Sequence, residues 1–592
     1  MVGLAILKQA MVSTLPVMLY SKQYYDDYWV ADHAAAIRAN DWLGAYDHLT
    51  LVKGPFSPFF LAVCSKLGIP FLTAEQLWHS LACLIVVAAL APLLRSSWSR
   101  IIVYIGLLFD PISWAAWTFQ RVYRNGLTVS QALIVISCLC ALYLRRDRPL
   151  LQRLPWSLGA GLSLATMWHN REDTAWILPF VFVATAIMLC SATVRLFFAL
   201  RAKKDTRKQT PLVWGSFAGS VLVVLLPLGT LGASNAYVSH LNQENYGLSC
   251  YNEINDCHFP DFMKAIYSVK WDTTGLPERT DVPLEKLEYL YTLSPTLNSI
   301  SDAMTEKYKA WAHDKGYVEN GMLIWPLRDG VHAAGYYQPA GRGGAADTDR
   351  LYANIAAEIH EAISSGRAQG QPTMPSSLMP PWHSIYSSEL PRTVSEFYHF
   401  VVSFQDVKPS AEGWDNEPLR NRIMLGLSGD RSVSLSDDFS PAELQYVEPV
   451  VNRLNRIAAV YGAVTPPFAS VTALAWVGML GSLLIRQGEW ARRRDAVLLL
   501  TGIAGSVIAI LTGVAYNQIA SVKSSYYMYL SGAYPLMLLF TTVTLCLAAE
   551  HASPHVISGI ARLRHGARAR RERRRDARSI GQDPVSSSDS SD

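Results

Sequence analysis

Two adjacent carboxylates, Asp26 and Asp27, follow the first apolar run of the chain, within the stretch SKQYYDDYWV. A carboxylate can take a proton from an attacking hydroxyl group, and a neighbouring carboxylate can tune its pKa or share a divalent cation with it. The plainer interpretation is a solvated acidic pair that helps to keep this loop on one side of a membrane. Position alone does not separate the two, so a metal site at Asp26 and Asp27 stays open.

A basic residue follows the acidic pair in the segment TLVKGPFSPFF, where Lys53 precedes Gly54 and Pro55. An ammonium group beside a kinked apolar segment suits a lipid phosphate, because the ammonium pairs with the phosphate while the aromatic side chains face the lipid chain. Ordinary snorkelling of an interfacial lysine is the alternative.

Three further polar segments add candidates. Cations placed beside a departing phosphate stabilise the negative charge that develops on it. Structural arginine–carboxylate pairs at helix ends are the competing interpretation. The candidates in QRVYRNG and WHNRED are Arg121, Arg124, His169, Arg171, Glu172 and Asp173. The segment SVKSSYYMY adds Lys523 and Tyr526 as supporting residues.

Apolar runs must position these groups. Half of the 592 residues are hydrophobic and 17% are charged, which is too few charges for a soluble protein of this length. A membrane span needs roughly 20 mostly apolar residues. The sequence therefore predicts an α-helical, polytopic membrane protein with about ten spans. They lie at about 2–20, 76–94, 101–118, 127–144, 155–169, 174–194, 211–234, 464–485, 496–515 and 528–549.

Basic loops set the predicted orientation. With a cytoplasmic N-terminus, the loops 94–100, 145–153, 201–209 and 486–495 and the tail 562–578 all fall on the cytoplasmic side. The C-terminus is then cytoplasmic, and the polar candidates face the other side. The basic tail is expected to contact anionic lipids, so no nucleic acid is predicted as a partner.

The sequence predicts four parts. Residues 1–234 form a membrane module with a first external loop at 21–75, 235–460 an extracytoplasmic domain, 461–550 the last membrane helices, and 551–592 a basic, disordered tail. Helical spacing at 283–293, 301–312 and 351–363 predicts a mainly helical external domain, with loops at 338–349 and 364–382.

Two cysteines lie outside the apolar runs. Cys250 and Cys257 fall within LSCYNEINDCHF in the predicted external region. A lone pair closing a short loop there predicts a disulfide, with two free thiols as the alternative.

The order of an acidic pair, an amphipathic helix and KGPFSPFFLA resembles integral-membrane glycosyltransferases of the GT-C class, such as the protein O-mannosyltransferases and the lipid A aminoarabinose transferases. Their first external loop carries two acids and then a Lys/His-Pro-Pro segment. The match here is Asp26-Asp27 and Lys53-Gly54-Pro55, with Asp for the second acid and Gly for the first Pro. The likeness covers much of the first half and points to a poorly characterised bacterial branch.

The resemblance implies a polyprenyl-phosphate-linked sugar as donor and an extracytoplasmic acceptor, which is a cell-envelope glycan, a glycolipid or a protein. It implies inverting transfer with Asp26 as the base and Asp27 as a supporting carboxylate. It also implies a multi-pass protein of the bacterial inner membrane, with membrane lipids as partners and an external active site.

Other functions leave less trace in the sequence. No zinc-ligand spacing, phosphate-binding loop or dinucleotide fingerprint occurs, so no cofactor is expected apart from the open divalent cation. A transporter or lipid flippase should show internal pseudo-symmetry, which is not seen here. A non-catalytic envelope assembly protein is the other alternative, and it predicts that Asp26 and Lys53 are replaceable.

Overall fold

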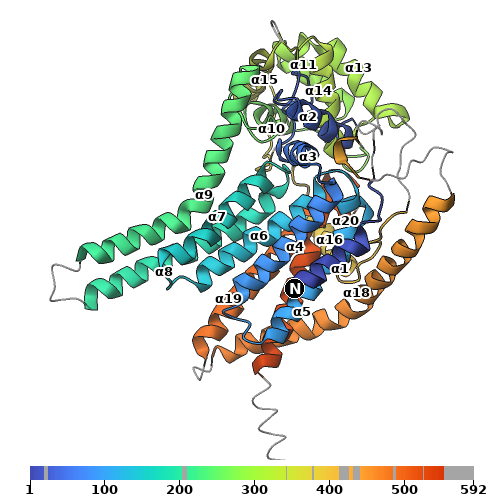
Figure 1. Cartoon of the computed structure of the whole chain (residues 1–592). Helices are drawn as coiled ribbons and strands as arrows, with labels where there is room; N and C mark the ends of the chain where they lie inside the picture. Colours follow the sequence, from blue (N-terminus) through green and yellow to red (C-terminus); the bar gives the residue numbers. More distant parts are fainter. Residues whose placement is uncertain are drawn as a thin grey trace, which may run out of the picture.

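The computed structural model describes residues 1–18, 20, 24–202, 210–339, 341, 343–376, 379–411, 424, 426–430, 441–484, 489–523 and 526–551. This part of the chain is helical, and the β-bridges within it are the isolated pairs Met18 with Arg121 and Val269 with Gly370. A bundle of long helices lies below a cap of shorter ones (Figure 1).

Seven described helices are long and apolar enough to cross a membrane, judged by length and composition. They are α4 (Phe71–Leu90), α6 (Asn125–Leu144), η3 with α8 (Thr174–Arg201), the apolar part of α9 (Val213–Tyr246), α18 from Gln445 (Gln445–Ser482), α19 (Trp490–Ala520) and the last helix (Ala533–His551). Side chains of α8, α9 and α18 such as Phe198, Leu222 and Leu474 are exposed, as lipid contact requires.

The count of about ten spans is therefore not confirmed. The other three predicted spans coincide with α1 (Val2–Val12), α5 (Ser97–Leu108) and α7 (Leu150–Trp168), of which α1 and α5 are too short. The run 101–118 breaks at Asp110–Pro111, because Asp110 accepts from the backbone N–H of Ile112 and begins a short 3₁₀ helix, η1 (Pro111–Trp114).

Several of the predicted cytoplasmic loops meet at one end of the bundle. Arg95 pairs with Glu489, and Arg146 pairs with Asp495 at 2.8 Å. The loops 94–100, 145–153 and 486–495 are thus neighbours, in keeping with a common side. Residues 203–209 and the tail 562–578 lie outside the described residues.

The cap contains α10 (Phe259–Ser268), α11 (Leu284–Leu293), α12 (Pro295–Asn298), α13 (Ser301–Ala312), α14 (Ile324–Ala333) and α15 (Ala345–Ser364). The helices predicted at 283–293, 301–312 and 351–363 are confirmed. The loop predicted at 338–349 is wrong after Gly344, because α15 begins at Ala345. Asp347 in its first turn accepts from the N–H of Gly343 and stabilises this earlier start.

Two large apolar cores organise the described part of the chain. The membrane helices share one core, which also takes Phe397 and Phe400 of α16 (Tyr386–Val402). The cap shares the second core with the first loop, whose helices α2 (Asp27–Arg38) and α3 (Phe56–Leu67) contribute Trp29 and Leu61. The first loop therefore folds with the cap, and Figure 1 shows α2 and α3 directly beneath it.

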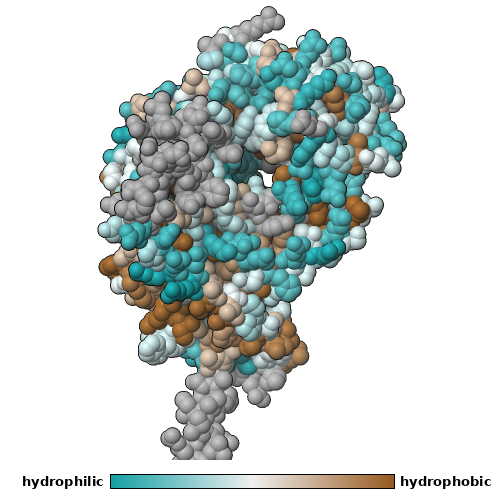
Figure 2. All heavy atoms as spheres, turned by 90° about the vertical axis from the view of Figure 1, so that its right-hand side faces the viewer, coloured by the Kyte–Doolittle hydropathy of each residue, from teal (hydrophilic) through white to brown (hydrophobic). Residues whose placement is uncertain are grey.

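Surface polarity follows the same division. On the face drawn in Figure 2 the cap is largely hydrophilic and the lower part carries a hydrophobic belt. Away from this face, α8 and α9 form a long hairpin that leaves the bundle, and α9 rises from it into the cap (Figure 1). The candidate residues lie between the cap and the bundle of long helices.

Candidate active site

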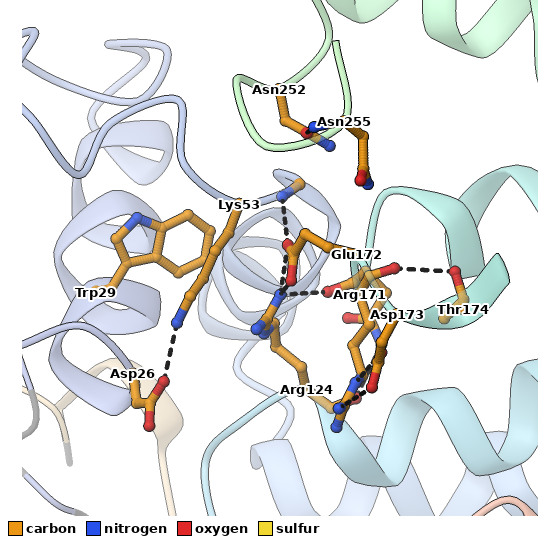
Figure 3. Close-up of polar contacts among 12 residues, drawn as sticks. Asp26, Trp29, Lys53, Arg124, Arg171, Glu172, Asp173, Thr174, Asn252 and Asn255 are labelled. Atoms are coloured by element: carbon orange, nitrogen blue, oxygen red, sulfur yellow. Dashed lines mark hydrogen bonds and ion pairs between the residues drawn. The ribbon is translucent and has the colours of Figure 1, made fainter. Parts of the chain in front are cut away.

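The charged candidates of the first loop and of two helix-connecting turns come together beneath the cap (Figure 3). Asp26 directly precedes α2, and Lys53 lies just before α3. Arg121 and Arg124 connect the π-helical turn η2 (Ala116–Gln120) to α6, and residues 171–173 connect α7 to the 3₁₀ helix η3 (Thr174–Ile177). Segments far apart in the sequence thus share one site.

Gly54 makes the close approach of two of these segments possible. The backbone N–H of Phe56 donates to the carbonyl of His169 at 3.0 Å, and that of Gly54 donates to Glu172 Oε1 at 3.2 Å. A Cβ atom on Gly54 would lie 2.2 Å from the oxygen of His169. Glycine fits this contact better than the first proline of the GT-C pattern would. It has no Cβ atom, and it keeps the backbone N–H group that proline lacks.

Asp26 is the accessible carboxylate of the acidic pair, with 34% of its side chain exposed. Its Oδ1 accepts from Lys53 Nζ at 2.8 Å and from the Tyr123 hydroxyl at 2.7 Å, and Arg121 lies 3.4 Å from Oδ2. Burial raises the pKa of Asp26, but the charges of Lys53 and Arg121 outweigh it and hold this pKa well below its usual range. Asp26 is therefore ionised.

Asp27 is fully buried and saturated. Arg121 Nε donates to its two oxygens at 2.8 and 3.0 Å, and the backbone N–H of Tyr20 donates at 3.1 Å. Burial raises the pKa of Asp27 to about 7, against the opposing charge of Arg121. The two adjacent acids thus have opposite environments, and Asp26 alone is open to a substrate.

Lys53 lies in an aromatic cage with 4% of its side chain exposed. Its Nζ is 5.7 Å from the ring centre of Trp29, 5.5 Å from that of Tyr123 and 5.6 Å from that of Trp325. It also donates to the carbonyl of Tyr25 and, at 2.8 Å, to Asp26. Burial lowers its pKa, and the charge of Asp26 opposes this. A snorkelling lysine would extend towards water, whereas this ammonium points inward.

The remaining cations each hold a carboxylate. Arg124 Nη1 donates to both oxygens of Glu172, at 2.7 and 2.8 Å, and both side chains are buried. Arg171 donates to Asp173 at 2.8 and 2.5 Å, and half of the Asp173 side chain is exposed. In this structure Arg124 and Arg171 therefore form arginine–carboxylate pairs, which is the alternative to a role in phosphate binding.

The supporting candidates contribute unequally. His169 Nε2 lies 3.2 Å from the hydroxyl of Ser234, and its carbonyl holds the first loop as described above. Lys523 is exposed and forms no hydrogen bond or ion pair with the described residues, and the side chain of Tyr526 lies outside them.

Sequence reasoning missed several contributors. Tyr123 lies between the two predicted arginines, and only its place in QRVYRNG could have signalled it. Trp325 comes from the cap, where the local sequence gave no signal. From the short helix α20 (Tyr526–Tyr529), Met528 Sδ is 3.6 Å from Arg121 and the ring centre of Tyr529 is 5.4 Å from Arg171. Asn252 and Asn255 lie beside the cluster (Figure 3).

The predictions about metal and disulfide stay open. The described residues contain no group of three or more His, Cys, Asp or Glu side chains placed to share a metal ion. Lys53 and Arg121 supply positive charge to the acidic pair instead. Cys250 and Cys257 carry free thiols that lie within hydrogen-bonding reach of each other, so the disulfide remains a prediction.

Comparison with known proteins gives a likeness among solved structures. No model of a known protein family matches the chain, and no curated protein matches it. Among solved structures, ArnT from Cupriavidus metallidurans in the apo state is similar at 13% identity, over 93% of this chain and 76% of that chain, with a TM-score of 0.27. ArnT is an aminoarabinose transferase of the GT-C class. At that TM-score the argument for function rests on the site itself.

Proposed function

We propose that the protein is a GT-C glycosyltransferase that moves a sugar from a polyprenyl-phosphate donor to a hydroxyl group of an extracytoplasmic acceptor, with inversion. One observation carries the proposal. An exposed carboxylate, Asp26, touches a caged ammonium, Lys53, between apolar helices and a hydrophilic cap. That combination offers a base for a hydroxyl and a counter-ion for a lipid phosphate at the depth where a lipid headgroup lies.

The proposed reaction needs one base. Asp26 Oδ2 takes the proton of the acceptor hydroxyl as its oxygen forms a bond to the anomeric carbon. On the opposite face the bond from that carbon to the phosphate oxygen breaks, and its electron pair leaves with the polyprenyl phosphate. Lys53 stabilises the charge that develops on the leaving phosphate. Asp27 supports this arrangement by fixing Arg121 beside Asp26.

Donor binding would also activate the base. Without donor, Lys53 holds the pKa of Asp26 low, and a strongly acidic carboxylate is a weak base at neutral pH. A phosphate that takes over the hydrogen bonds of Lys53 withdraws that cation from Asp26, so the pKa of Asp26 rises. The base then becomes competent only when a donor is present.

Arg171 is the second phosphate candidate. Its partner Asp173 is half exposed, so a phosphate can displace that carboxylate at lower cost than it can displace the buried Glu172 from Arg124. Arg124 and Arg121 then act on the phosphate over a longer range through their charge. Lys523, whose side chain is exposed shortly before α20, is a further proposed contact for an incoming donor.

The location of the site supports an enzyme of the bacterial inner membrane that works on its outer face. The donor enters from the membrane, and the acceptor approaches beneath the cap formed by helices α10 to α15. A transporter would place its polar residues near mid-membrane between related halves. Here the charged candidates lie between the bundle and the cap.

Binding of sugar-free polyprenyl phosphate to the protein in lipid nanodiscs tests the proposal. We expect Lys53→Ala to weaken binding by about 1.5–3 kcal/mol, or roughly ten- to 150-fold, because a buried charge-assisted contact is lost. Lys66→Ala is the matched control, since Lys66 is exposed on α3 and contacts only Asn40 among the described residues. Equal affinity in Lys53→Ala and the wild type would contradict the proposed phosphate site.

A further inference from the structure

We infer that helix α14 of the cap forms one wall of the active site, with Trp325 and Asp329 as positioning residues for Lys53 and Asp26. The inference rests on the proposed function, because it assigns these residues to the same donor site. It gives the 235–460 region a direct part in donor binding, through a segment about 300 residues beyond the acidic pair.

Trp325 closes the aromatic cage from the side of the cap. Its ring centre lies 5.6 Å from Lys53 Nζ and 4.4 Å from the ring centre of Tyr25. The other two rings of the cage, Trp29 and Tyr123, come from the first loop and the turn before α6. Cation–π contact favours the charged ammonium and fixes its place, so loss of Trp325 would leave Lys53 free to move on one side.

Asp329 fixes the residue that precedes Asp26. Its carboxylate accepts from the Tyr25 hydroxyl at 3.0 and 3.2 Å and from the indole N–H of Trp311 at 2.7 Å. The backbone carbonyl of Tyr25 in turn accepts from Lys53. Asp329 therefore sets the backbone position from which both the carbonyl and the Asp26 side chain reach Lys53.

The neighbouring residue on α14 holds the other end of the first loop. Arg328 is fully buried, and it donates from Nε and Nη2 to the carbonyl of His48 at 3.0 and 2.6 Å. It also forms an ion pair with Glu253 at 2.6 Å. His48 Nε2 lies 3.4 Å from Asp329 Oδ1. Two adjacent residues of α14 thus grip the loop at residues 25 and 48, on either side of α2.

These contacts explain why Asp26 and Lys53 meet. The two residues are 27 positions apart in a loop whose own helices, α2 and α3, are short. The apolar core of this loop is shared with the cap, and Asp329 and Arg328 of the cap add polar contacts at residues 25 and 48. Changes on α14 should therefore reach the donor phosphate through Lys53, without touching the donor.

The test measures the affinity of sugar-free polyprenyl phosphate for the full-length protein in lipid nanodiscs. We expect Asp329→Asn, Tyr25→Phe and Trp325→Leu each to weaken binding by about three- to tenfold, the size of one lost hydrogen bond or cation–π contact. The double variant Asp329→Asn with Tyr25→Phe should bind no more weakly than Tyr25→Phe alone, because Tyr25→Phe already removes the hydrogen bond that Asp329→Asn weakens. The matched controls are Asp261→Asn, exposed on α10, and Trp382→Leu, which stacks on Tyr516.

A second background separates a positioning role from general loss of structure. If Asp329 acts through Lys53, Asp329→Asn should have no further effect on affinity in Lys53→Ala protein. Equal fold-losses in the two backgrounds, or wild-type affinity in both Asp329→Asn and Tyr25→Phe, would overturn the inference. Tyr25→Phe carries the test alone if Asp329→Asn does not fold. Unchanged binding in Lys53→Ala would instead overturn the proposed function.

Discussion

The two halves of the charged cluster have nearly the same composition and very different exposure. In one half, Lys53 holds Asp26 through a single hydrogen bond of 2.8 Å, and a third of the Asp26 side chain is exposed. In the other half, Arg124 holds both oxygens of Glu172 at 2.7 and 2.8 Å, and 10% or less of each side chain is exposed. In the first half, Asp26 Oδ2 has one long contact, with Arg121 at 3.4 Å, and the carboxylate is partly exposed. In the second half, Arg124 holds both oxygens of Glu172 closely, and little of either side chain is exposed.

This difference gives the two pairs different roles: Asp26 with Lys53 can react with a substrate, whereas Arg124 with Glu172 stabilises the fold. A carboxylate that must take a proton needs an oxygen that the substrate can reach and that no short hydrogen bond occupies. A buried bidentate pair instead fixes the turns that carry it, and removal of either partner leaves a buried charge uncompensated. Each half pairs one acidic with one basic side chain, so charge alone does not separate the two halves, and burial decides which role each one has.

The largest expected effect is on the open half. We expect Asp26→Asn to lower the rate of sugar transfer by about 10²–10⁴-fold while donor binding persists, because asparagine keeps the size of the side chain but cannot accept the proton. Asp27→Asn should have the smaller effect on the rate, since Asp27 is buried behind Arg121. Transfer assays on purified protein with a polyprenyl-phosphate sugar measure both.

Asp32→Asn serves as the control, because Asp32 lies on α2, which Asp26 precedes, and most of its side chain is exposed. Near-normal turnover in folded Asp26→Asn protein would remove Asp26 from the role of base. Loss of transfer in Asp27→Asn alone would assign the role to its neighbour and reverse the comparison of the two halves.

Substitutions in the buried half, Arg124 with Glu172, should lower the free energy of unfolding. Arg124→Ala leaves Glu172 buried without its cation, so we expect the free energy of unfolding to fall by about 3–5 kcal/mol. Arg171→Ala should be milder, because its partner Asp173 is half exposed and can be solvated. Thermal unfolding in detergent ranks the two variants, and equal losses would show that burial does not distinguish these pairs.

The contact between the first loop and the end of α7 should tolerate no side chain at Gly54. Gly54→Ala places a methyl group 2.2 Å from the carbonyl oxygen of His169, so the first loop must move away from α7. We expect a loss of about 1–3 kcal/mol in the free energy of unfolding, the usual cost of overpacking. Gly229→Ala is the control, because nothing lies within 4 Å of a Cβ atom there. An unchanged melting temperature in Gly54→Ala would show that the first loop can move away from α7 at no cost.

The sequence predicted the members of the site better than their arrangement. Asp26, Lys53 and the cations of the two turns are neighbours as expected, because short polar segments between apolar helices must gather at the same membrane boundary. Trp325 and Asp329 were not predictable, since they enter through tertiary contacts between the cap and the first loop. The predicted span at 101–118 is not confirmed, because its apolar composition continues past Asp110–Pro111, where a new short helix begins.

The smallest predicted effect concerns the one hydroxyl group that links the two halves. The Tyr123 hydroxyl donates to Asp26 at 2.7 Å, accepts from Arg124 at 3.0 Å and lies 3.3 Å from Lys53 Nζ. Tyr123→Phe keeps the ring of the cage but removes a hydrogen bond that favours ionised Asp26, so the pKa of Asp26 should rise. The acid limb of the pH–rate profile then moves to higher pH, and the rate at neutral pH should change by no more than about two- to tenfold, the size of one hydrogen bond. If the acid limb of the pH–rate profile does not move and the fold is intact, then Asp26 titrates independently of Tyr123 and the Arg124–Glu172 pair.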